Sequence, residues 1–68
     1  MDVKTVIKNI DNTIHGKEML REKLYSISQQ STDPDTIKMM TAVVDFIDVN
    51  LTELRAIKRD LEMCAGRD

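Results

Sequence analysis

Apolar residues recur along the chain at intervals of three and four, which is the period of one face of an α-helix. In both halves of the chain the pattern repeats every seven residues. This period is typical of helices that pack along a coiled-coil-like seam. The positions that we expect in the core between two such helices are Val3, Val6, Ile7, Ile10, Ile14, Leu20, Leu24, Ile27, Ile37, Met40, Val44, Ile47, Leu51, Leu54, Ile57 and Leu61.

The two periodic segments are separated by a short stretch of turn-forming residues, Ser-Thr-Asp-Pro-Asp, at 31–35. Asp33 is suited to cap the N-terminus of a helix, and Pro34 is suited to its first position, where the missing N–H breaks no hydrogen bond. High-propensity helix formers dominate elsewhere. The predicted elements are a helix at about 3–30, a turn at 31–33 and a helix at about 34–64.

The facing positions agree with this turn. In an antiparallel hairpin the numbers of facing residues add up to a constant, and pairs such as Ile10 with Leu54 and Leu20 with Val44 add up to 64. Half of that sum falls inside the turn, which the capping residues define independently. The sequence therefore predicts a single all-α domain, an antiparallel two-helix hairpin. Gly16 leaves open whether the first helix bends near its middle.

The second helix carries more apolar residues than one neighbouring helix can cover. A contiguous apolar patch is unusual on a soluble monomer, and a chain of this length buries only about 60% of its unfolded surface. We therefore expect two or more hairpins to associate, most simply as a homodimer that forms a four-helix bundle. A bent monomer that shields the patch and a patch reserved for another protein are the alternatives. The expected interface positions are Met39, Ala42, Phe46, Val49, Ala56 and Met63.

The charge balance gives no general attraction to nucleic acid or anionic lipid. Ten basic and twelve acidic residues leave a net charge of -2, so strong binding to phosphate backbones is not expected. The longest apolar runs are two or three residues, such as 42–44, which is too short to cross a bilayer. The N-terminus is polar and has no signal-peptide core. We expect a cytoplasmic protein without a membrane partner.

Few residues in the chain could support chemistry. His15 and Cys64 are the only soft metal ligands, and Asp45 and Asp48 lack neighbours that would complete a magnesium site. We therefore expect no catalytic residue, no metal and no cofactor, and interpret these side chains as solvated. Asn50 lies beside the seam, where it either fixes the register of a buried interface or bonds to solvent.

The predicted hairpin is similar in size and architecture to the plasmid copy-number regulator Rop, whose hairpins dimerise into a four-helix bundle that binds paired RNA loops. This resemblance covers the whole chain as architecture and implies a nucleic-acid-binding regulator. In the antiparallel register, basic residues of both helices gather at the end away from the turn. These residues are Lys4, Lys8, Arg55, Lys58 and Arg59. Acidic residues are interspersed among them, which is typical of a solvated surface.

Residues 41–45, Thr-Ala-Val-Val-Asp, are similar to the Ser-Gln-Glu-Leu-Asp signature of the small aspartyl-phosphate phosphatases of sporulation phosphorelays. The stretch keeps the hydroxyl and the aspartate and differs at the three positions between them. The resemblance implies a phosphatase that works through Asp45.

The function that the sequence predicts first is a small, non-enzymatic, self-associating helical regulator or adaptor that acts through protein–protein contacts. Compact accessory proteins of phages, plasmids and bacteria are often built this way. A Rop-like nucleic-acid regulator is the second hypothesis, and the aspartyl-phosphate phosphatase is the third.

Overall fold

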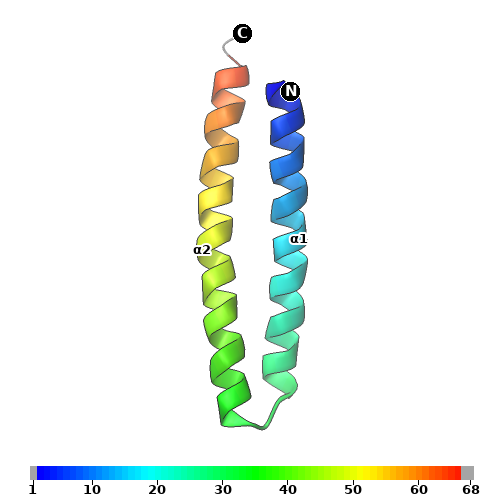
Figure 1. Ribbon diagram of the computed structural model, residues 1–68, viewed down its shortest axis with the longest axis vertical. Coiled ribbons are helices and arrows are strands. Elements are labelled where there is room, and N and C mark those ends of the chain that lie inside the picture. Colours follow the sequence, from blue (N-terminus) through cyan, green and yellow to red (C-terminus); the bar gives the residue numbers. More distant parts are fainter. Residues whose placement is uncertain (1, 67–68) are drawn as a thin grey trace.

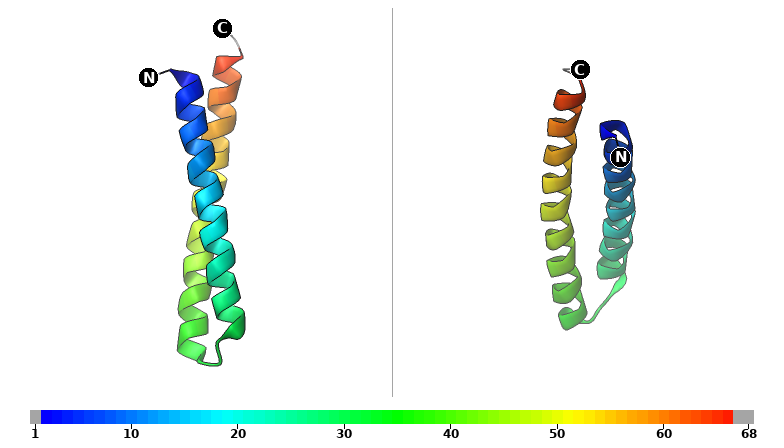
Figure 2. Two further views of the ribbon diagram at one scale, coloured as in Figure 1. Left: turned by 90° about the vertical axis from the view of Figure 1, so that its right-hand side faces the viewer. Right: turned by 45° about the horizontal axis from the view of Figure 1, so that its top comes forward.

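The computed structural model describes residues 2–66, which form two α-helices joined by a short turn. Helix α1 spans Val3–Gln30 and helix α2 spans Pro34–Ala65. The helices lie side by side and antiparallel, so that the start of α1 and the end of α2 share one end of a rod of 53 × 15 × 15 Å (Figure 1). They cross at a shallow angle (Figure 2). The prediction of an all-α two-helix hairpin is confirmed.

Aspartates precede both helices, but they make different hydrogen bonds. The Asp2 carboxylate accepts a hydrogen bond of 2.7 Å from the backbone N–H of Thr5, and this bond lowers the pKa of Asp2. Asp33 occupies the cap position before Pro34, as its sequence context predicts, yet its side chain bonds to no backbone N–H. It accepts a 2.7 Å bond from the hydroxyl of Thr36, which lowers the pKa of Asp33. The Thr36 hydroxyl, three residues after Asp33, competes with the backbone N–H groups as a hydrogen-bond donor to the Asp33 carboxylate.

Helix α1 continues through Gly16 without interruption, so the bend considered from the sequence does not occur. A Cβ atom at this position would meet no atom within 4 Å. Helix α2 ends at Ala65, and Gly66 keeps a right-handed backbone while its N–H donates to the carbonyl of Glu62 at 3.0 Å. Both helices are therefore long and regular, and the turn provides the change of direction.

The buried core is a narrow seam near the middle of the rod. Its apolar members are Ile14 of α1 and Val44, Ile47 and Leu51 of α2; Leu51 has the smallest exposed fraction, 3%. Half-buried apolar side chains extend the seam toward both ends. These are Val6, Ile7, Ile10, Leu24, Met40, Leu54 and Leu61. Ile10 and Leu54, which the predicted register pairs, both pack against this core.

Five positions predicted to lie in the core are exposed in the hairpin, and their assignment is corrected here. They are Val3, Leu20, Ile27, Ile37 and Ile57. The apolar stripe on each helix is wider than the strip that one neighbouring helix covers, so residues at its edges face solvent. Leu20 and Ile57 keep 47% and 48% of their surface exposed. The hairpin core is consequently smaller than the sequence pattern predicts.

Candidate interaction surface

The hairpin has two long flanks, one on each side of the seam. Side chains follow one another around an α-helix by about 100° per residue, so positions just before and just after the seam point to opposite flanks. Because the helices run antiparallel, positions on the same rotational side of the seam in α1 and α2 meet on the same flank. The two flanks differ sharply in chemistry.

One flank is crossed by three ion pairs between α1 and α2, and we call it the ion-paired flank. Its pairs are Asp11 with Lys58, Glu18 with Arg55, and Arg21 with Asp48. Both helices place these residues at the same spacing of seven and then three. Surface ion pairs of this kind contribute little to stability, but they leave this flank hydrated and polar.

The geometry of these pairs follows from the lean of the side chains. Side chains on an α-helix tilt toward its N-terminus, so long side chains on antiparallel helices lean toward one another. Lys58 Nζ lies 2.7 Å from a carboxylate oxygen of Asp11, and this hydrogen bond raises the pKa of Lys58. Arg21 donates two hydrogen bonds to the carboxylate of Asp48, which raises the pKa of Arg21.

The opposite flank is apolar, and both helices contribute to it. We call it the apolar flank, and its large side chains are Leu20, Ile27, Met39, Val43, Phe46 and Ile57. Phe46 keeps 68% of its surface exposed and Met39 keeps 61%. In α2, Met39, Val43 and Phe46 follow one another at the three- and four-residue spacing of a helical stripe, and Asn50 and Glu53 separate them from Ile57. In the half of the rod nearer the turn, the flank is thus a contiguous apolar surface rather than a scatter of single residues.

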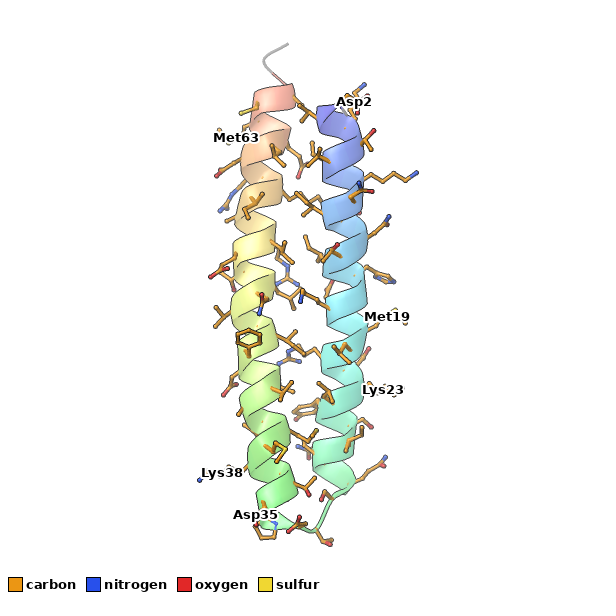
Figure 3. All side chains as sticks on the ribbon, in the orientation of Figure 1. Asp2, Met19, Lys23, Asp35, Lys38 and Met63 are labelled. Carbon is orange, nitrogen blue, oxygen red and sulfur yellow. The ribbon has the colours of Figure 1, made fainter. Side chains whose placement is uncertain are left out.

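The six interface positions predicted from the sequence fall on two different faces of α2. Met39 and Phe46 lie on the apolar flank, whereas the other four recur every seven residues on the side turned away from α1. We call this second set the outer stripe; it consists of Ala42, Val49, Ala56 and Met63. Figure 3 shows Met63 pointing away from α1, and likewise Met19 pointing away from α2.

Sequence reasoning missed part of the apolar flank. Leu20 and Ile27 of α1 were expected in the core, and Val43 was expected in neither place. The signal that identifies them is their position one residue before a side chain that the hairpin covers. Val43 precedes buried Val44 as Phe46 precedes Ile47, Ile27 precedes buried Ser28, and Leu20 precedes half-buried Arg21.

Two polar residues interrupt the apolar flank at one height of the rod, Thr13 on α1 and Asn50 on α2. The Thr13 hydroxyl donates to the carbonyl of Asn9 at 3.0 Å, and the Asn50 amide donates to the carbonyl of Phe46 at 2.9 Å. Asn50 is half-buried by its neighbours. Each side chain therefore makes a local bond and retains further hydrogen-bonding capacity toward the flank surface.

The residues considered for chemistry lie apart and exposed. His15, Cys64, Asp45 and Thr41 are all exposed. Within residues 2–66, no group of three or more His, Cys, Asp or Glu side chains is placed to hold a metal ion. Neither of the two described helices contains a stretch apolar enough to cross a bilayer.

The basic end of the rod is partly neutralised. Arg55 and Lys58, two of its five basic residues, are bound in ion pairs with Glu18 and Asp11. The region therefore presents mixed charge rather than a continuous positive surface. No protein-family model, no curated protein and no solved structure matches the chain.

Proposed function

We propose that the protein is a small, non-enzymatic helical regulator or adaptor that pairs with a second copy of itself through the apolar flank. The observation that carries this proposal is the contrast between the flanks. One is crossed by ion pairs, while the other exposes large apolar side chains from both helices. A second hairpin laid on the apolar flank would complete a four-helix bundle, the architecture in which such amphipathic pairs bury their faces.

The exposed area supports pairing of this kind. The hairpin has an accessible surface of 5346 Å². A compact monomer of 7.8 kDa exposes about 4400 Å² by the scaling of surface with mass. The excess, roughly 900 Å², is close to the ~800 Å² that each partner buries in an interface of standard size. The area that a dimer needs is therefore present on a single chain.

The size of the core points the same way. Ile14, Val44, Ile47 and Leu51 are the only apolar residues among 2–66 that the hairpin buries. Cys64 is the only cysteine in the chain, so no disulfide within one chain can supplement so small a core. Small domains without disulfides or metals commonly gain stability by association.

The outer stripe would stay exposed in such a dimer, because it faces away from both α1 and the apolar flank. Its seven-residue spacing and its apolar members Val49 and Met63, each 57% exposed, suit contact with a helix of another protein. We assign the regulatory or adaptor contact to this stripe. Pairing and partner binding would then use separate faces of α2.

Light scattering after size exclusion tests the self-association. The proposal expects a mass of twice the 7.8 kDa of one chain at micromolar concentrations. A mass of one chain at several hundred micromolar would refute it. The measurement needs no knowledge of the further partner, so it decides the first half of the proposal alone.

A further inference from the structure

We infer that the two copies pair with their turns at the same end, so that α1 of each hairpin packs on α2 of the other. In this arrangement Thr13 and Asn50 of both copies form one polar layer across the interface. The inference rests on the proposed pairing through the apolar flank. It adds the direction of the second copy and the residues that specify it.

Two-fold symmetry allows two ways to lay one apolar flank on another. If the axis runs along the rod, the turns lie at the same end and each α1 meets the α2 of the second copy. If the axis runs across the rod, the turns lie at opposite ends, α1 meets α1 and α2 meets α2. For two rods that lie parallel, an isologous interface permits no third choice.

The apolar parts of the two flanks meet only in the first arrangement. Leu20, Ile27, Met39, Val43 and Phe46 lie in the half of the rod nearer the turn. In the other half, the α2 side of the flank carries Asn50, Glu53 and Asp60 beside Ile57. With the turns together, the apolar half of one copy is brought to the apolar half of the other.

The second arrangement juxtaposes groups that mismatch. At full overlap of the two rods, the apolar half of each flank lies on the half of the other that carries Asn50, Glu53 and Asp60. Asn50 of one copy then lies opposite Phe46 of the other, where the amide has no polar partner. The distribution of apolar and polar residues along the flank thus favours turns at the same end.

The polar layer gives a reason for Asn50 next to Phe46 on the apolar flank. One N–H of its amide bonds to the Phe46 carbonyl, while its oxygen and its second N–H have no hydrogen-bond partner among the described residues. With the turns together, Asn50 and Thr13 of both copies share one height. Amide and hydroxyl groups can then bond across the interface. A buried asparagine layer of this kind fixes register and orientation at some cost in stability.

The native Cys64 allows a direct test. It is the single cysteine of the chain and is exposed at the end of α2, so a spin label attached there should not disturb the flank. With turns together, the two α2 helices lie diagonally in a bundle of ~10 Å interaxial spacing, about 14 Å apart. With turns apart, each Cys64 lies about 16 residues from mid-height, which separates the two by about 48 Å along the rod.

Double electron–electron resonance on the labelled dimer should give one distance below about 30 Å, with the label length included. A label moved to the turn, in Cys64→Ser/Thr32→Cys, should also give a short distance. Long distances at both positions from a particle of dimer mass would overturn the inference and leave the proposed pairing intact. A particle of one-chain mass would instead refute the pairing itself.

The Asn50→Leu variant tests the polar layer separately. Removing the amide should raise the melting temperature of the dimer and add a second, long Cys64 distance, because the amide then no longer disfavours the other orientation. A variant that keeps the single short distance would show that Asn50 does not specify the arrangement. Thr52→Leu, an exposed polar position on the ion-paired side of α2, is the matched control and should leave the distance distribution unchanged.

Discussion

Phe46 is the residue at which hairpin stability and association separate most clearly. It keeps 68% of its surface exposed in the hairpin, so it contributes little to the seam between α1 and α2. We predict that Phe46→Ala weakens association strongly and leaves the isolated hairpin no less stable. Alanine has the higher helix propensity by about 0.5 kcal/mol, which offsets the small loss of packing within α2.

The magnitude follows from the exposed fraction. Full burial of a phenylalanine side chain is worth about 1.5–3 kcal/mol, and about two-thirds of that remains to be gained by a residue as exposed as Phe46. Each copy then contributes about 1–2 kcal/mol to pairing, and the two copies together about 2–4 kcal/mol. At 1.4 kcal/mol for each tenfold change, the dissociation constant should rise about 30- to 700-fold.

Sedimentation equilibrium over a concentration series measures this change. Tyr25→Ala is the matched control, because Tyr25 is also aromatic and 51% exposed but lies on the side of the ion-paired flank. The control should shift the dissociation constant by less than about threefold, the scale of an ordinary surface substitution. Coincident curves for Phe46→Ala and the unsubstituted chain would show that Phe46 lies outside the interface and would refute the reasoning.

Three further predictions address the core, a helix cap and the outer stripe. Leu51→Ala should lower the free energy of unfolding by about 2–5 kcal/mol in urea titrations at fixed protein concentration, because Leu51 is the most buried side chain of the seam; a loss below about 1 kcal/mol would contradict the described core. The hydrogen bond from the Thr5 N–H lowers the pKa of Asp2, so the cap that Asp2 forms on α1 should be complete above the ordinary pKa of 3.8. It should be lost as the pH falls through the lower pKa of the folded state. The chemical shift of the Thr5 amide proton should follow this titration and become insensitive to pH in Asp2→Asn; a shift that still titrates in that variant would contradict the assignment of the cap. Val49→Glu should leave the mass of the dimer unchanged in light scattering, since the outer stripe faces away from the apolar flank; dissociation would show that pairing uses the outer stripe instead.

The hairpin could be predicted from the sequence because two independent signals coincide. The heptad pattern places the seam, and the Asp33–Pro34 pair places the turn at the residue number that the pairing requires. Local chemistry and long-range packing therefore indicate one structure. The bend considered at Gly16 does not occur, because the residues on both sides are held by packing against α2.

The flanks were harder to predict because they depend on rotation about the helix axes. A heptad pattern shows which residues approach the seam, but the covered width depends on how closely one neighbour packs. Leu20 and Ile27 therefore fit the core pattern and yet lie at its edge. The ion pairs could not be read from the register alone, because their residue numbers add up to 69, 73 and 69 and not to 64.

The contact between the two apolar flanks can be observed directly at Phe46, the single phenylalanine of the chain. An isotope-filtered nuclear Overhauser experiment on an equal mixture of ¹³C-labelled and unlabelled protein detects only contacts between copies. We predict signals from the Phe46 ring of one copy to the Leu20 methyl groups of the other. A Phe46 ring that shows no contact with the second copy, at concentrations where the mass is that of a dimer, would contradict the account.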